Sequence, residues 1–285
     1  MSMYVKRLLY HLKWGKLTFI GKPVFVTLVT VELLCERLMD MLFSSISDSN
    51  RVDENVTAVI KTFERPKELK RLIKSIKCFY PDMKIIVVDD SRDPSKIAGV
   101  KTITMPYDSG VSAGRNLAVF AVETKYLLLL DDDYIFYRKS ILEPAVKKMD
   151  ENSRIDIMGG ERVDLPLYRK VDNKRETLYH TRREATMSYG SSIGGMVVQD
   201  KVANFYIGRT ESIKRVGWDD RIKRLDHADF FTRAKGVLTT VFNPDFKVLH
   251  AQTPFNKIYM DKRKAYEEDQ KLIYKKYYVD ESFSG

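Results

Sequence analysis

The 285-residue chain contains little cysteine and, near its start, no long uncharged apolar run. Its two cysteines, Cys35 and Cys78, provide neither a disulfide framework nor a cysteine-based metal cluster, and they fit a reducing compartment. Within the first fifty residues the longest charge-free segment is 23–31, far shorter than the roughly 18 apolar residues of a membrane span. Internal repeats and low-complexity tracts are also absent. Because no apolar run is long enough, we expect neither a secretory signal nor a transmembrane segment.

The overall composition is that of an ordinary folded protein, with 44% hydrophobic and 31% charged residues. The length suits one large α/β domain, or such a domain with an appendage. A formal net charge of +10 points to an anionic partner, which is a nucleotide, a lipid head group or a nucleic acid. Basic residues are spread along the chain, however, and aromatic residues are not grouped with them as a base-stacking surface requires. We therefore expect no nucleic-acid partner.

Residues 1–50 form a predicted N-terminal helical extension. Glu32, Glu36 and Asp40 recur every four residues and share one face of a helix. Apolar residues lie largely on another face: Leu34, Leu38, Met41 and Leu42. Such a helix either packs on the main domain or on a second copy of the chain, or it anchors the protein to an anionic membrane surface. The polar segment 44–55 is predicted to be a linker.

The sequence YLLLLDDD, residues 126–133, is the most informative stretch of the chain. Its apolar part does not alternate with polar residues, which predicts a strand buried on both faces. Asp131, Asp132 and Asp133 follow directly, and three like charges at the end of a buried strand repel one another. A hard divalent cation such as Mn²⁺ or Mg²⁺ would relieve that repulsion. The alternative interpretation is a solvated acidic turn.

Two predicted strands precede this stretch, at 56–61 and 84–88, with an amphipathic helix between them. This order predicts a βαβ unit with a parallel sheet. The second strand ends in Asp89 and Asp90. A third strand leads to a helix start at Ser109 or Gly110, where a phosphate group could bind.

The order of the segments VTAVIKTFERP, IIVVDDS, GVSAGRNLAV and YLLLLDDD resembles the nucleotide-sugar half of glycosyltransferases with the GT-A fold. IKTF, FYPDMKIIVVDDS, TKYLLLLDDDYIF, IMGG, VANFYIGRT and HADFF add a similarity to the β-1,4-N-acetylgalactosaminyltransferases that build gangliosides. The resemblance runs from about Val56 to His250. It implies a GT-A-like (Rossmann-like), mixed and mainly parallel sheet flanked by helices. The catalytic domain is expected at 51–255, followed by a basic and aromatic helical tail at 256–285.

The resemblance also implies roles for individual residues. Asp89 or Asp90 matches the carboxylate that holds the uracil or ribose of a UDP-sugar, and Arg115 with Asn116 matches the pair that supports the nucleotide. In the DxD element, Asp133 would be the direct metal ligand and Asp131 the ribose-side or water-mediated contact. The sequence leaves open which aspartate touches the ion, so Asp132 is kept as a donor-site residue.

Candidate acceptor residues follow in the second half of the chain. Asn204 lies near the start of a predicted strand, 202–208. Trp218 and Asp219 combine a ring on which a sugar could stack with a carboxylate that accepts its hydroxyl groups. The alternative for Trp218 is an ordinary packing residue.

Two histidines and one carboxylate complete the predicted site. His250, expected just past a strand, could be a metal ligand beside Asp133 or a hydrogen-bonded structural histidine, and the resemblance favours the metal ligand. His227 and Asp229 are the candidate catalytic bases, and they point about 200° apart on a helix. We favour Asp229, with His227 orienting the acceptor, although the motif register is compatible with either assignment.

Together these features predict a metal-dependent inverting glycosyltransferase. It would transfer a sugar, with N-acetylhexosamine favoured, from a UDP-sugar to a hydroxyl of a glycan or glycolipid. A cytoplasmic location, with peripheral attachment to the membrane, fits the cysteine content and the basic extension. A sugar-nucleotide pyrophosphorylase is the alternative enzyme, but TFERPKE replaces the Gly-rich loop that it would need after the first strand. A non-catalytic glycan-binding module is the second alternative, and the three aspartates argue against it.

Overall fold

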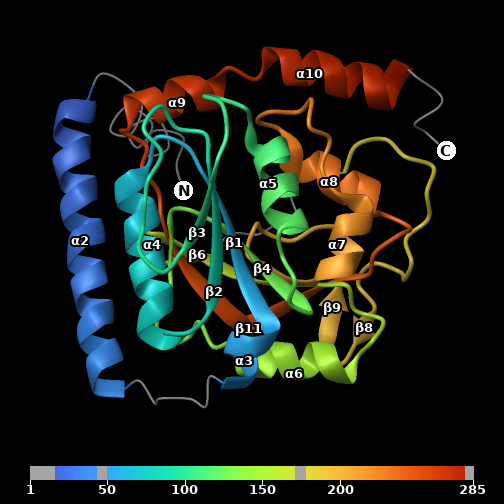
Figure 1. Ribbon diagram of the computed structural model, residues 1–285, viewed down its shortest axis with the longest axis horizontal. Helices are drawn as coiled ribbons and strands as arrows, with labels where there is room; N and C mark the ends of the chain where they lie inside the picture. The colour runs from blue at the N-terminus through green and yellow to red at the C-terminus, as the bar shows by residue number, and fades with distance from the viewer. Residues whose placement is uncertain (1–16, 44–49, 171–177, 280–285) are drawn as a thin grey trace, which may run out of the picture.

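The computed structural model describes residues 17–43, 50–170 and 178–279 (Figure 1). One sheet dominates it, with the strand order β3-β2-β1-β4-β10-β6-β11-β9-β8, while β5 pairs with β11 and β7 with β6. The strands are β1 (Val56–Thr62), β2 (Lys84–Asp89), β3 (Lys101–Thr104), β4 (Tyr126–Asp131), β5 (Tyr134–Ile135), β6 (Ile157–Leu165), β7 (Arg169–Lys170), β8 (Ser192–Ile193), β9 (Met196–Val198), β10 (Tyr206–Arg209) and β11 (Thr240–Ala251). The helices are α2 (Thr18–Phe43), α3 (Asn50–Asn55), α4 (Pro66–Phe79), α5 (Val111–Phe120), α6 (Glu143–Glu151), α7 (Thr210–Val216), α8 (Asp226–Ala234), α9 (Lys257–Lys264), α10 (Glu267–Tyr274) and the π-helical turn η2 (Lys275–Val279).

The pairing directions confirm the predicted mixed sheet. Strands β3, β2, β1 and β4 are mutually parallel, and so are β6 and β11, whereas β10 runs antiparallel between β4 and β6. From β1 the chain builds outward to β2 and β3 and then returns to place β4 on the other side. The carboxyl ends of β1 and β4 therefore form a switch in strand order, the place where α/β sheets usually bind ligands.

Both faces of the sheet are covered by helices, which explains why the central strands lack polar alternation. Ala58 and Ile60 point into a core shared with α4 and α6, while Val59 between them points into a second core shared with α5, α7 and α8. Strand β4 behaves in the same way, and its five apolar residues are all buried. The prediction of a strand buried on both faces is confirmed.

Several predicted boundaries differ from the structure. The expected strand 202–208 is reduced to 206–209, and His250 lies within β11 rather than beyond its end. The predicted linker contains α3, whose Val52 is completely buried in the first core. Local sequence did not indicate that His250 lies inside β11, because β11 continues past an irregularity at Asn243 through its pairing with β6. That pairing is a tertiary contact.

The C-terminal segment 256–285, predicted as a tail, is packed on the catalytic domain as far as it is described. Asn256 caps α9 and also donates from Nδ2 to the carbonyl of Glu64 at 3.0 Å. Asp269 of α10 accepts backbone N–H groups just before α8, including that of Arg224 at 2.6 Å. Helices α9 and α10 cross the top of the molecule in Figure 1. The segment is thus part of the folded unit.

The N-terminal helix α2 is longer than the sequence indicated. It begins at Thr18 and continues through Pro23, where the basic stretch was expected to end. With 26 residues it is long and apolar enough to cross a membrane, judged by length and composition alone. The expectation that this region is too short for a span was wrong, because only the uninterrupted apolar run had been counted. Figure 1 shows α2 as an outer column beside α4.

Candidate functional site

A pocket of about 320 Å³ lies at the carboxyl ends of β1, β2 and β4, at the switch in strand order. It brings together residues from the sheet edge, from the start of α8, from β11 and from α9. Eight of the predicted site residues line it: Asp90, Arg115, Asp131, Asp132, Asp133, Asn204, His227 and His250. Five others do not: Asp89, Asn116, Trp218, Asp219 and Asp229.

The three aspartates after β4 have different environments. Asp132 is fully buried and turns back toward β1, where it accepts the Thr62 hydroxyl at 2.6 Å. Burial and the neighbouring carboxylates raise the pKa of Asp132 to about 7, although Arg65 opposes that shift. Asp131 is the most exposed of the three. Asp132 is therefore suited to support, whereas Asp131 and Asp133 are the pair available to a ligand.

Arg65, which the sequence analysis missed, offsets much of the repulsion among these carboxylates. Its guanidinium is buried, pairs with Asp132 and donates from Nη1 to Asp133 Oδ2 at 2.7 Å. It also lies 3.9 Å from the ring centroid of Tyr259 on α9. Burial opposes ionisation of Asp133, but Arg65 and His250 hold its pKa well below the usual range. The cluster is therefore stabilised by a cation of the chain itself.

Asp133 and His250 are neighbours, as predicted, with 3.3 Å between Oδ2 and Nε2. The other ring nitrogen of His250, Nδ1, lies 2.7 Å from Asp164 Oδ1. A carboxylate that orients a histidine in this way is common around metal ligands. Burial lowers the pKa of His250, but the two carboxylates raise it to about 9. A metal ion would therefore have to displace a proton from this imidazole.

The described residues contain no group of three His, Cys, Asp or Glu side chains arranged to hold a metal. Asp133 and His250 nevertheless fit a metal as two neighbouring protein ligands whose remaining positions a diphosphate and water would fill. This donor set, oxygen with one imidazole, suits Mn²⁺ or Mg²⁺.

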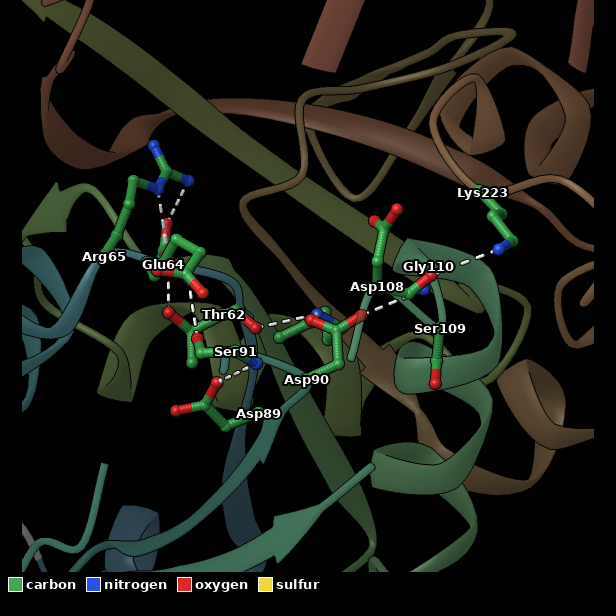
Figure 2. Close-up of polar contacts among 12 residues, drawn as sticks. Thr62, Glu64, Arg65, Asp89, Asp90, Ser91, Asp108, Ser109, Gly110 and Lys223 are labelled. Carbon is green, nitrogen blue, oxygen red and sulfur yellow. Dashed lines mark hydrogen bonds and ion pairs between the residues drawn. The ribbon is translucent and has the colours of Figure 1, made fainter. Parts of the chain in front are cut away.

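Asp89 and Asp90 have separate functions, and only Asp90 faces the pocket. Asp89 accepts the backbone N–H groups of Ser91 and Ser95 at 2.9 and 2.8 Å and so closes the loop after β2. Figure 2 shows its contact with Ser91 on the side away from Asp90. Asp90 pairs with Lys61 and accepts from the Gly110 N–H at 2.9 Å. Of the two candidates, only Asp90 is therefore in a position to contact a ligand in this pocket, whereas Asp89 holds the loop.

The glycines of this region serve packing inside the chain. A Cβ on Gly114 would lie 2.3 Å from Cδ of Lys61, so the glycine makes room for the lysine that pairs with Asp90. At the start of α5 the N–H of Gly110 is bound by Asp90, and that of Val111 by the Lys223 carbonyl at 2.9 Å. Two of the donors that we expected to receive a phosphate at this helix start, the N–H groups of Gly110 and Val111, are thus already bound.

Arg115 connects the two halves of the pocket. It is buried, pairs with Asp226 at the start of α8, and donates from Nη2 to Asp131 at 2.8 Å. Its neighbour Asn116 points elsewhere and binds the backbone N–H and carbonyl of Trp218 at 2.8 and 2.9 Å. Asn116 therefore positions a loop and, in this structure, does not reach the donor site.

Trp218 and Asp219 do not form a sugar platform. Trp218 is buried and stacks on Phe230 at a centroid distance of 4.4 Å, within the second core. Asp219 is held by Arg221 and by Lys276 at 2.7 and 2.9 Å. The structural interpretation of Trp218 was the correct one. Without this ring the glycan-binding alternative loses its main support.

The two candidate bases are in very different positions. Asp229 is 0% exposed, accepts from Lys276 Nζ at 2.7 Å and from the Tyr277 hydroxyl at 2.6 Å, and does not line the pocket. His227 lines the pocket, and its Nε2 lies 2.7 Å from the carbonyl oxygen of Val202. A carbonyl only accepts, so Nε2 carries the proton and Nδ1 is the basic nitrogen. Our choice of Asp229 is therefore corrected, because a base must reach the acceptor.

Most of the cationic lining of the pocket was not predicted from the sequence. These cations are Lys61, Arg65, Arg162, Lys223, Arg224, Lys262 and Arg263. Of the residues described, Lys223 and Arg263 have no carboxylate within ion-pair distance, whereas Arg224 and Lys262 both pair with Asp108. The basic character of 256–278 was recognised, but its position over the pocket depends on the packing of α9.

Comparison with known proteins adds an independent line of information. The sequence profile described as Glycosyl transferase family 2 matches residues 57–216. Beta-1,4 N-acetylgalactosaminyltransferase 1 of Homo sapiens is 36% identical over 207 residues, which cover 69% of this chain and 39% of that protein. Beta-1,4 N-acetylgalactosaminyltransferase 2 of Mus musculus is also 36% identical, with 70% and 40% covered. The chain thus spans about two fifths of the length of these relatives.

Solved structures show the same fold at lower sequence similarity. The crystal structure of S. aureus TarS 1–349 in complex with UDP-GlcNAc superposes with a TM-score of 0.54 at 16% identity. The match covers 81% of this chain and 69% of that one. The complex of the same fragment with UDP gives a TM-score of 0.52 at 15% identity, covering 81% and 68%. At such identity the likeness supports the GT-A-like architecture alone.

Proposed function

The chain belongs to glycosyl transferase family 2, and we propose that it transfers a sugar from a UDP-sugar to a hydroxyl group with inversion at the anomeric carbon. The observation that carries this proposal is the position of Asp131 and Asp133 at the end of β4, in one pocket with Asp90 and His227. That pocket contains carboxylates for a nucleoside and a metal, cations for a diphosphate and a base for an acceptor.

Donor binding would use both ends of the pocket. Asp90, fixed by Lys61 and the Gly110 N–H, accepts hydrogen bonds from the uracil or ribose. Lys223 and Arg263 bind the diphosphate, because cations without a carboxylate partner lose no ion pair when an anion enters. N-acetylhexosamine is the favoured sugar, since the relatives are named N-acetylgalactosaminyltransferases and the TarS fragment was crystallised with UDP-GlcNAc.

Asp133 and His250 would hold Mn²⁺ or Mg²⁺, with Asp164 orienting the imidazole. Once bound, the ion would supply Lewis-acid stabilisation of the departing diphosphate. Arg65 already neutralises part of the charge on Asp133 and remains able to do so as UDP leaves.

His227 is the proposed general base. The acceptor hydroxyl gives its proton to Nδ1 while its oxygen bonds to the anomeric carbon from the face opposite UDP. The bond from that carbon to the diphosphate oxygen breaks, and UDP leaves with the electron pair. The hydrogen bond from Nε2 to the Val202 carbonyl fixes the tautomer that this step requires. Asn204, which lines the same pocket, remains the predicted acceptor contact.

The proposed acceptor is a glycan or a glycolipid; the β-1,4 linkage in the names of the relatives supports a sugar hydroxyl as the acceptor group. We further propose a cytoplasmic location, since Cys35 and Cys78 are both exposed free thiols.

The test is a screen of UDP-sugars for acceptor-dependent release of UDP, measured with Mn²⁺, with Mg²⁺ and without a metal. We expect turnover with a UDP-N-acetylhexosamine and a decrease of about 10²–10⁴-fold in kcat for His227→Gln. Donor affinity, measured by UDP titration, should change little in that variant. Wild-type activity in His227→Gln would refute its assignment as the base, and release of sugar 1-phosphate would refute the transferase reaction itself.

A further inference from the structure

Helix α2 directs its carboxylates inward, against the usual orientation of a surface helix. Glu32 Oε1 accepts the backbone N–H of Leu167 at 2.7 Å, and Asp40 Oδ1 accepts that of Arg138 at 2.9 Å. Glu36, between them, is buried and pairs with the Arg138 guanidinium. All three acidic residues of the helix are thus bound to the catalytic domain.

The opposite face of α2 is apolar and exposed. Val31, Leu34 and Leu38, which follow at helical spacing, are 51, 57 and 57% exposed. Other large apolar residues of the helix are exposed with them: Phe19, Ile20, Val24, Val26, Leu28, Met39, Met41, Leu42 and Phe43. A helix of 26 residues is about 39 Å long. An apolar strip of that length exceeds what scattered surface residues produce and indicates a partner.

The turn that Glu32 binds also presents an exposed apolar side chain. The turn between β6 and β7 carries Leu167, which is 68% exposed although its backbone is bonded to Glu32. Its φ of 75° lies in the left-handed region, which is costly for a leucine. The turn thus holds an exposed apolar side chain next to α2 in a backbone conformation that is unfavourable for leucine.

The charges of α2 that remain exposed are positive. Because Glu32, Glu36 and Asp40 face the domain, only Lys22 and Arg37 are left as exposed charges of the described helix. Lys74 on the neighbouring α4 is exposed as well, and Arg37 and Lys74 line the same groove between the two helices. Exposed apolar residues flanked by cations match an anionic lipid surface, where each cation adds attraction to the head groups.

We propose that the outward face of α2, centred on Val31, Leu34 and Leu38, docks this chain on an anionic lipid bilayer with the helix lying in the membrane plane. The helix keeps its contacts with the domain along its length, from the edge-on contact of Phe25 with Phe255 to that of Asp40 with Arg138. A spanning orientation would break these contacts and remove Glu32 from its partner, at a cost that in-plane docking avoids. This docking is independent of the proposed reaction.

The first experiment is vesicle flotation of the full chain. Phosphatidylcholine vesicles with 30% phosphatidylglycerol are compared with vesicles of phosphatidylcholine alone. We expect binding to the anionic vesicles that falls at least tenfold in the variant Leu34→Glu/Leu38→Glu. The matched control is Leu117→Glu/Phe120→Glu, which places two charges at exposed apolar positions of α5 and should bind like the wild type. Equal binding of both double variants, or no binding of the wild type, would overturn the proposal.

Two further measurements test the alternatives to in-plane docking, which are a helix that spans the bilayer and a second copy of the chain. Alkaline carbonate should release the docked protein, whereas a protein that stays with the membrane pellet spans the bilayer and refutes in-plane docking. Size-exclusion chromatography with light scattering, without lipid, tests a second copy. A dimer that Leu34→Glu/Leu38→Glu dissociates, together with absent vesicle binding, would assign the face to self-association instead.

Discussion

Variants of the buried ion pair between Asp229 and Lys276 test whether Asp229 stabilises the fold or acts in catalysis. Lys276 Nζ is 2.7 Å from Asp229 and 2.9 Å from Asp219, and it is almost completely buried. Replacing one partner of such a pair leaves an uncompensated charge in the interior, which costs about 3–5 kcal/mol. Lys276→Met should therefore lower the free energy of unfolding by that amount. Among the described residues, the Tyr277 hydroxyl is then the one side chain left to donate to Asp229.

Asp229→Asn should be milder, because Lys276 keeps Asp219 as its partner. We expect a loss of about 1.5–3 kcal/mol, the range of a hydrogen bond to a charged group. The double variant Asp229→Asn/Lys276→Met should lose less than the sum of the two single changes, since the charge left uncompensated by the methionine is then absent. Urea denaturation monitored by circular dichroism measures the free energy of unfolding of each of the three variants.

Measurement of kcat distinguishes a structural role of Asp229 from the role of catalytic base that the sequence favoured. Asp229 does not line the pocket, so Asp229→Asn should retain kcat within about threefold at a temperature where it is folded. A general base would instead cost about 10²–10⁴-fold. Unchanged stability combined with such a loss in kcat would refute our assignment and restore Asp229 as the base.

Three other predictions test the remaining parts of the pocket. Asp133→Asn should lower turnover by orders of magnitude and EDTA should abolish wild-type activity, while full activity in excess chelator would contradict the metal site. Lys223→Met should weaken donor binding about 10–100-fold as a rise in KM, since one charged hydrogen bond is lost, and Lys147→Met on the exposed side of α6 should leave KM unchanged. Gly114→Ala should destabilise the fold by about 1–3 kcal/mol, because the added methyl group meets the buried Lys61 side chain; a thermal midpoint equal to that of the wild type would show that the lysine can move away.

Local sequence was sufficient for the frame of the fold. The buried strands are mainly apolar and end beside charged residues, so β1, β2 and β4 could be located within a residue or two of their observed bounds. Parallel strands share a carboxyl edge, and this predicted one site for Asp131, Asp133 and either Asp89 or Asp90; the structure brings Asp90, Asp131 and Asp133 into one pocket. Motif resemblance extended the same inference to His250.

Direction and pairing of side chains were decided only by the tertiary structure. Asp89 and Asp90 are adjacent in sequence, but the first closes a loop and the second enters the pocket. A residue's neighbours on its own helix could not indicate that Lys276, 47 positions along the chain, neutralises Asp229.

The sequence by itself therefore determined which elements form and which edge of the sheet is functional, because periodicity and strand-end charge are local properties. It did not determine which face of α2 meets the domain. Helical spacing shows that Glu32, Glu36 and Asp40 share a face, and only the positions of Arg138 and Leu167 decide that this face is buried and the apolar one is exposed. Contacts between distant segments depend on how the whole chain packs, and no local pattern encodes them.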